Sequence, residues 1–231
     1  MNTIARPVSI AVDAAQQVSG LLQAPREARA CYVLAHGAGA GMTHPFMTAI
    51  ADRLAQRAVA TLRYQFPYME RGSKRPDTPK VAQAAVRAAV AAASGLQPGL
   101  ALYAGGKSFG GRMTSQAQAA STLPGVRGLA FLGFPLHPAG KPSAERGAHL
   151  SDVHVPMLFL QGTRDELAHT ELLAPLVGQL GARATLELLQ DADHSFHVPA
   201  RTGRKDSDVL DHACDALVRW IERVGGVAGP R

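Results

Sequence analysis

The sequence is poor in cysteine and has no long apolar stretch. Its two cysteines, Cys31 and Cys214, are expected to be packed free thiols, as in proteins of a reducing cytoplasm. No stretch approaches the roughly 20 apolar residues that a membrane-spanning helix requires. The first ten residues lack the basic start and apolar run of a signal peptide. We therefore expect a cytoplasmic protein with no membrane partner.

The sequence also lacks any block of charge of one sign. Lys and Arg number 24 against 18 Asp and Glu, which gives a formal net charge of +6. A basic balance can indicate a nucleic-acid partner or an acidic substrate. The basic residues are mostly arginines, however, and they are scattered without a basic run. We expect no nucleic-acid partner.

Length and composition are those of one globular domain. The chain has 231 residues, of which 46% are hydrophobic and 18% charged, so it is neither disordered nor fibrous in composition. It shows no internal repeat and no low-complexity linker. We predict a single domain over residues 1–231, long enough to bury a core of its own.

Short apolar runs alternate with segments of helical periodicity. Apolar runs bounded by glycine indicate buried strands, and apolar residues three or four apart indicate helices. The predicted strands are 8–12, 17–22, 30–35, 59–64, 100–104, 126–132, 157–160 and 184–189. The predicted helices are 44–58, 79–94, 109–121, 166–180 and 208–224. This alternation predicts a mostly parallel sheet with helices on both faces.

A G-x-S-x-G sequence follows the predicted strand 100–104. Ligands of such sheets bind beyond the carboxyl ends of the strands, so catalytic residues are expected in the loops found there. Gly106-Lys-Ser-Phe-Gly110 lies between a strand and a helix, the context this motif requires. A serine on so tight a turn adopts a strained conformation and needs small neighbours, which Gly106 and Gly110 provide. The pattern predicts that Ser108 is a nucleophile.

Two other interpretations of this turn compete. Gly106-Lys107-Ser108 ends like a phosphate-binding P-loop, but that motif requires glycine where this sequence has Ala101. A glycine-rich turn between a strand and a helix can also be purely structural. The turn alone is therefore only moderately specific.

Two later loops supply the partners that a serine nucleophile needs. It needs a general base, and the base needs a carboxylate to hold its tautomer. Asp165 and His194 follow the last two predicted strands, which gives the chain order Ser, Asp, His. Asp165 could instead cap a helix, and His194 could be a solvated loop residue. His197 shares the loop, but His194 lies nearer the strand end and is the predicted base.

An oxyanion hole requires two backbone N–H donors. One is expected from Phe109, directly after the nucleophile. The other is expected from Ala38, with Gly39 as the alternative, in the glycine-rich loop after strand 30–35. No third ligand accompanies the close histidines of the 190s loop, so we predict no metal site and no cofactor.

Several basic residues surround the predicted nucleophile. Lys107 adjoins it and Arg112 lies one turn into the following helix. We predict that Lys107 and His137 contact the substrate. Further basic residues, in the loop 64–78, are Arg71, Lys74 and Arg75. These charges are either ordinary solvated ones or a site that favours substrates with a carboxylate.

Longer segments resemble the α/β-hydrolase superfamily along essentially the whole chain. They are 36–46 (HGAGAGMTHPF), 63–68 (RYQFPY), 105–112 (GGKSFGGR), 134–142 (FPLHPAGKP) and 191–196 (DADHSF). More narrowly, they resemble a small group of predicted hydrolases related to dienelactone hydrolase. That group includes bacterial proteins, a vertebrate testis-expressed protein and a subunit of a histone-acetylating complex. The resemblance implies the α/β-hydrolase fold, with Ser108, Asp165 and His194 as nucleophile, acid and base.

The expected function is cofactor-free hydrolysis of small-molecule esters. Dienelactone hydrolases generally use a cysteine nucleophile, so the serine here does not carry over their substrate. Only the loops 64–78 and 134–150 are long enough to cover the site. We therefore expect minimal or no cap domain and a preference for small acyl groups. The alternative is a binding or scaffold protein that keeps the fold without activity.

Overall fold

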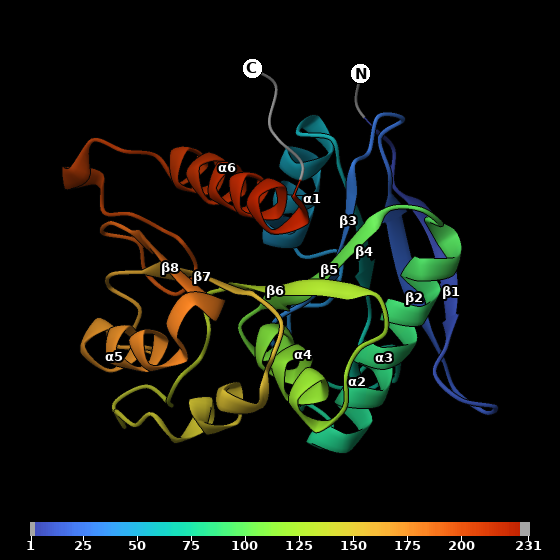
Figure 1. Ribbon diagram of the computed structural model, residues 1–231, viewed down its shortest axis with the longest axis horizontal. Helices are drawn as coiled ribbons and strands as arrows, with labels where there is room; N and C mark the ends of the chain where they lie inside the picture. Colours follow the sequence, from blue (N-terminus) through green and yellow to red (C-terminus); the bar gives the residue numbers. More distant parts are fainter. Residues whose placement is uncertain (1–2, 227–231) are drawn as a thin grey trace.

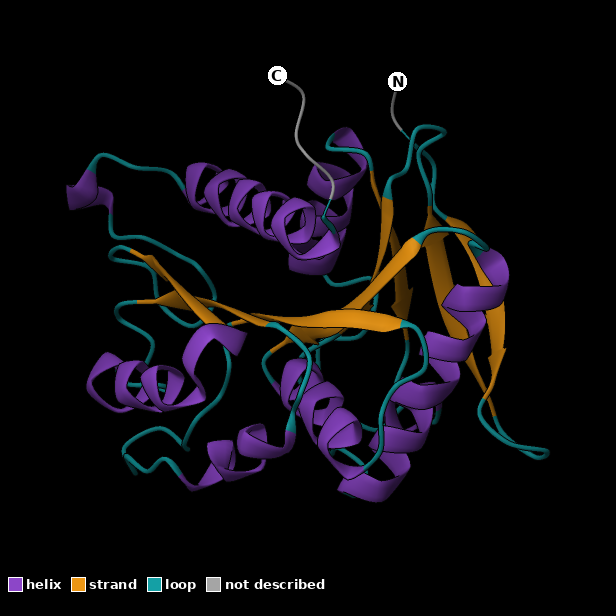
Figure 2. Cartoon of the chain, viewed as in Figure 1, coloured by secondary structure: helices purple, strands orange, loops and turns teal. Residues whose placement is uncertain are grey.

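One sheet lies between two layers of helices in the computed structural model, which describes residues 3–226 (Figures 1 and 2). Its eight strands are ordered β1-β2-β4-β3-β5-β6-β7-β8. They are β1 (Arg6–Ala11), β2 (Gln17–Gln23), β3 (Ala30–Ala35), β4 (Val59–Tyr64), β5 (Ala101–Lys107), β6 (Val126–Leu132), β7 (Met157–Gly162) and β8 (Ala184–Leu189). β2 is antiparallel to β1 and to β4, and every other pair is parallel. The predicted mostly parallel sheet is confirmed.

Helices cover both faces of the sheet, as the sequence predicts. The α-helices are α1 (Pro45–Gln56), α2 (Pro67–Glu70), α3 (Pro79–Leu96), α4 (Phe109–Ala120), α5 (Thr170–Leu180) and α6 (Asp206–Gly225). Three 3₁₀ helices are η1 (Glu145–Asp152), η2 (Gly181–Arg183) and η3 (Ala200–Thr202). α1 and α6 pack on one face, and α3, α4 and α5 on the other (Figure 1). None of these helices has the length and apolar character to cross a membrane.

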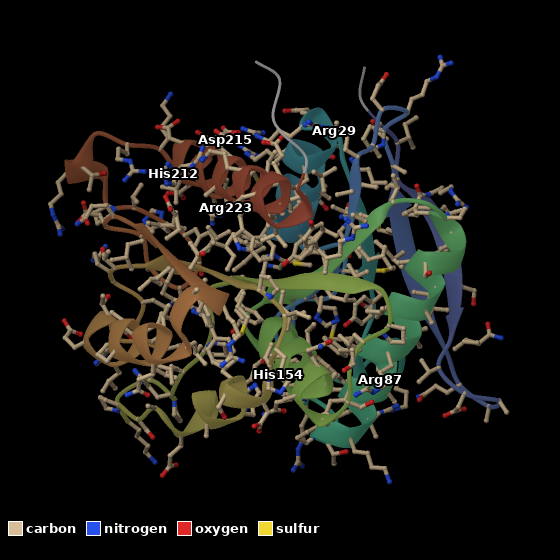
Figure 3. The ribbon with its side chains drawn as sticks, viewed as in Figure 1. Arg29, Arg87, His154, His212, Asp215 and Arg223 are labelled. Atoms are coloured by element: carbon tan, nitrogen blue, oxygen red, sulfur yellow. The ribbon has the colours of Figure 1, made fainter. Side chains whose placement is uncertain are left out.

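Polar contacts join the two helices on the face opposite α4. Arg57, at the end of α1, donates to Asp215 of α6 at 2.6 Å and to Asp211 at 3.2 Å. His212 of α6 lies 2.7 Å from Glu187 of β8. Figure 3 labels Asp215 and His212 on α6. The contacts are partly exposed, so each contributes little, and the apolar layer beneath holds the helix in place.

The observed limits of the strands and helices differ from the predicted limits mainly next to the loops that carry polar residues. β5 continues three residues past the predicted strand end, up to Lys107. α5 begins at Thr170 instead of 166, because the Asp165 side chain accepts the Leu167 N–H at 2.8 Å and favours a turn over a helix. Cys31 and Cys214 are buried free thiols, as predicted.

Candidate active site

Ser108 occupies a strained turn between β5 and α4. Its backbone angles are φ 51° and ψ −117°, outside the regions that non-glycine residues favour. A Cβ atom on Gly106 would lie 2.2 Å from the Ala35 carbonyl oxygen, and one on Gly110 would lie 2.6 Å from that of His36. Only glycine fits at both positions. The tight turn predicted from the sequence is present.

The structure brings Ser108, His194 and Asp165 together in one chain of hydrogen bonds. His194 Nε2 lies 2.8 Å from Ser108 Oγ, and His194 Nδ1 lies 2.7 Å from Asp165 Oδ2. An ionised carboxylate only accepts hydrogen bonds, so Nδ1 carries the proton and Nε2 is left to accept from the serine hydroxyl. The geometry is that of a nucleophile, a base and an orienting acid.

A glutamine that the sequence analysis missed fixes the carboxylate. The Asp165 side chain is fully buried. Gln161 Nε2 donates to Asp165 Oδ2 at 2.5 Å, and Gln161 Oε1 accepts from the Phe134 N–H at 2.8 Å. Gln161 is buried near the end of the apolar strand β7, and that polar residue in an apolar run was the signal available in the sequence.

Lys107 is turned toward the loop that carries His194. Its ammonium donates to the His194 carbonyl oxygen and lies 5.5 Å and 5.2 Å from the ring centroids of Phe46 and Phe196. Burial lowers the pKa of Lys107 to about 8, although the Asp165 carboxylate opposes the shift. Lys107 lines the pocket, but its charged end is engaged with the backbone of His194. Its contact with substrate stays a prediction.

The predicted oxyanion donors, the N–H groups of Phe109 and Ala38, belong to residues beside Ser108. Phe109 is the first residue of α4, so its N–H has no acceptor within the helix, and the positive end of the helix dipole lies there. Ala38 is exposed and lines the pocket beside Ser108. The N–H of Gly39 already donates to Tyr68 Oη at 3.0 Å. This favours Ala38 over Gly39 as the second donor.

His36 supports the loop that carries Ala38. It is fully buried, its Nδ1 lies 2.7 Å from the Gly37 carbonyl oxygen, and its Nε2 accepts from the Phe66 N–H at 3.1 Å. Burial lowers the pKa of His36 to about 4, so the ring is neutral at pH 7. Neutral His36 therefore links the loop after β3 to the one after β4.

Two other histidines of the sequence analysis lie away from the nucleophile. His137 is fully buried, with Nδ1 2.9 Å from the Pro138 carbonyl oxygen and Nε2 accepting from the His169 N–H at 3.1 Å. The structure contradicts its predicted contact with substrate, because both ring nitrogens serve to join two loops. His197 is exposed and lies 2.9 Å from Asp206, which raises its pKa.

A pocket of about 410 Å³ opens at Ser108. Its apolar walls include Phe46, Met47 and Leu167, and it also borders His194. A neighbouring cavity of about 380 Å³ is lined partly by residues of the loops 64–78 and 134–150, the loops that were expected to border the site. Within residues 3–226, no group of three or more His, Cys, Asp or Glu side chains is arranged to hold a metal ion.

The sheet order, the strained serine turn and the absence of a cap over the described residues define an α/β-hydrolase fold. The profile of the alpha/beta hydrolase domain family matches residues 28–222, and the chain belongs to this family. The fold prediction is confirmed.

Solved structures of similar fold cover nearly the whole chain. A dienelactone hydrolase from Anabaena variabilis is 20% identical with a TM-score of 0.75, over 96% of this chain and 99% of that one. A serine hydrolase without a lid from Xanthomonas campestris is 21% identical with a TM-score of 0.74, over 100% and 99%. An alpha-beta serine hydrolase homologue from Coxiella burnetii is 20% identical with a TM-score of 0.73, over 93% and 96%. At these identities the likeness shows the fold.

Proposed function

We propose that the chain is a cofactor-free serine hydrolase that cleaves carboxylic esters of small molecules, in a single domain over residues 1–231. The observation that carries this proposal is the hydrogen-bonded chain from Ser108 through His194 to Asp165. Its support is the pocket that opens at the serine and the oxyanion donors beside it. The triad roles rest on this geometry.

Acylation begins at the Ser108 hydroxyl. Its oxygen attacks the ester carbonyl carbon while His194 Nε2 takes the hydroxyl proton. Asp165 holds the Nδ1 proton and stabilises the imidazolium that forms. The N–H groups of Phe109 and Ala38 receive the negative charge that develops on the carbonyl oxygen. The tetrahedral intermediate then collapses, and the proton on Nε2 passes to the leaving alkoxide.

Deacylation repeats these steps with water as the nucleophile. Water takes the place of the departed alcohol, and His194 Nε2 removes its proton as it attacks the acyl carbon on Ser108. The second intermediate releases the carboxylic acid and returns the proton to Ser108 Oγ. Every group involved belongs to the chain, to the ester or to water.

The pocket suits small acyl groups. Its volume of about 410 Å³ is at the small end of the usual range for ligand sites. The similar structure from Xanthomonas campestris is described as lacking a lid. We also propose that the chain belongs to the narrower group related to dienelactone hydrolase, which has testis-expressed and histone-acetylation members. The segments 36–46 and 105–112 support this proposal, and they frame the pocket.

Hydrolysis of p-nitrophenyl acetate and butyrate tests the proposed function. We expect turnover by the wild-type protein and a loss of at least about a thousandfold in Ser108→Ala. Ser94→Ala is the matched control, because Ser94 is exposed on α3, away from the pocket. Equal activity of Ser108→Ala and Ser94→Ala would show that the hydrolysis does not use this site.

A further inference from the structure

A second cavity meets the pocket at the candidate nucleophile. Its volume is about 380 Å³, and both spaces are lined by Ala38, Ser108 and Leu167. A substrate with its carbonyl carbon at Ser108 can therefore extend into both. Arg112 and Arg146 line only the second, whereas the cation of the first, Lys107, donates to the His194 carbonyl oxygen.

These two arginines have no anionic partner among residues 3–226. Neither guanidinium forms an ion pair with a carboxylate there, and the Nε of Arg112 is buried without a hydrogen-bond partner. Burial, and then the like charge of Arg146, lowers the pKa of Arg112. Two close positive charges with an unused buried donor are unfavourable unless an anion joins them.

One acidic residue, Asp77, also lines the second cavity. Its Oδ1 accepts from Arg71 Nη2 at 2.5 Å, which balances its charge. Its Oδ2 is buried without a hydrogen-bond partner. Asp77 forms its ion pair with Arg71 and none with Arg112 or Arg146. The cavity thus keeps an excess of positive charge.

A hydrogen-bonded pair, Ser115 and His149, connects the two helices that carry the arginines. Ser115 Oγ donates to the Arg112 carbonyl oxygen at 3.0 Å and lies 2.7 Å from His149 Nε2. His149 belongs to η1, the same short helix as Arg146. Burial, and then the charge of Arg112, lowers the pKa of His149 to about 4, so it adds no third positive charge at pH 7. This contact fixes η1 against α4.

We propose that the second cavity is an anion subsite, in which Arg112 and Arg146 bind a carboxylate of the ester substrate. Arginine presents a planar fork of donors that matches a carboxylate, and Arg112 Nε is the donor that such a group would satisfy. The pocket with Phe46 and Met47 then takes the apolar part of the same substrate. This inference rests on the proposed ester hydrolysis and names its substrate class.

The position of Arg112 limits how far the carboxylate lies from the scissile bond. The Arg112 N–H donates to the Ser108 carbonyl oxygen at 3.1 Å, one turn along α4. Four residues of helix advance by about 6 Å. Because the two cavities also share their lining at Ala38, Ser108 and Leu167, the substrate we propose is a half-ester of a short dicarboxylic acid.

Two matched pairs of esters test the subsite on the wild-type protein. Monoethyl glutarate is compared with ethyl pentanoate for a charge on the acyl side, and 3-acetoxypropanoate with 3-acetoxypropanamide for the alcohol side. Hydrolysis is followed by pH-stat at low and high salt. We expect the anionic ester of at least one pair to have a kcat/KM at least about tenfold higher, and salt to reduce that advantage by screening. No preference in either pair would overturn the subsite.

Three variants then locate the charge that is responsible. In Arg112→Gln and Arg146→Gln we expect the ratio of anionic to neutral kcat/KM to fall at least about tenfold, the scale of one charged hydrogen bond. Arg201→Gln removes the same charge from an exposed residue of η3 and should keep the ratio within about twofold. A ratio that survives in both cavity variants overturns the assignment.

A binding measurement separates the subsite from the hydrolysis. In the Ser108→Ala background, monoethyl glutarate should raise the melting temperature more than ethyl pentanoate does, and adding Arg112→Gln should abolish the difference. This result without any wild-type turnover would keep the subsite and sink the proposed function. Turnover of both esters with equal kcat/KM would keep the proposed function and sink the subsite.

Discussion

At the scale of single residues, the two histidines after β8 differ in what they contact. His194 faces Ser108 and Asp165, whereas His197 is exposed and bonded to Asp206. We therefore predict that His194→Ala lowers kcat/KM by at least about a thousandfold and that His197→Ala lowers it by no more than about tenfold. Both variants are assayed on one p-nitrophenyl ester after circular dichroism has shown that they fold. The reverse order of the two losses would mean that the base is misassigned.

Lys107 gives a second prediction at this scale. In the native protein its pKa is lowered from 10.5 to about 8, so between these values the unfolded chain binds the extra proton. The contribution of Lys107 to the free energy of unfolding must then rise with pH across this window. The difference in unfolding free energy between wild type and Lys107→Met should shift in favour of wild type from pH 8 to 10, measured by urea denaturation. A difference that is flat or falls with pH would contradict the account.

The sequence identifies the residues of the site better than it identifies what each of them contacts. Ser108, Asp165 and His194 could be found because each follows a strand and the three come in a fixed order. Gln161 could not be assigned to Asp165, because its contact depends on how β7 ends. His137 was misjudged because nothing in its Pro-rich loop shows that both ring nitrogens are used by the backbone.

At the scale of elements, the loops after β3 and β4 are joined by one neutral histidine. His36 accepts from the Phe66 N–H, and its pKa of about 4 lies below the ordinary value of 6.5. Between pH 6.5 and 4 the unfolded chain binds a proton that the native ring refuses, so stability falls as pH drops through this window. Protonation would also remove the acceptor that holds Phe66.

A pH series of urea denaturations checks this role of His36. In His36→Gln the fall in unfolding free energy from pH 6.5 to 4 should be smaller than in wild type by up to about 3 kcal/mol, the size implied by such a shift. His154→Gln, which changes an exposed histidine, is the control and should keep the wild-type slope. Equal slopes in all three proteins would show that His36 is not held neutral by the fold.

The elements themselves were predictable where apolar patterning is strong. β3, β4, β6 and β8 have the predicted limits, because their apolar runs end at glycine or at polar residues. α2 and η1 were not predicted. Each is short and lies within a loop. η1 is stabilised by tertiary contacts such as that of Ser115 with His149, and not by a periodic apolar pattern of its own.

At the scale of the whole molecule, the absence of a cap over the described residues limits what the site can enclose. The pocket is small, and the loops 64–78 and 134–150 border the second cavity without forming a domain over it. We predict that butyryl esters are hydrolysed with higher kcat/KM than palmitoyl esters, because a long chain would leave most of its apolar surface in water. A series of p-nitrophenyl esters from acetyl to palmitoyl, in micelle-free conditions, measures this. A maximum at palmitoyl would contradict an uncapped small-acyl site.

Covalent labelling shows directly whether Ser108 is the nucleophile of an assembled triad. The protein is treated with a fluorophosphonate probe, digested, and the modified peptide is located by mass spectrometry. The account predicts a single adduct on Ser108, and loss of labelling in Ser108→Ala and in His194→Ala, since the base activates the hydroxyl. No adduct on the folded wild-type protein, or an adduct on another residue, would contradict it.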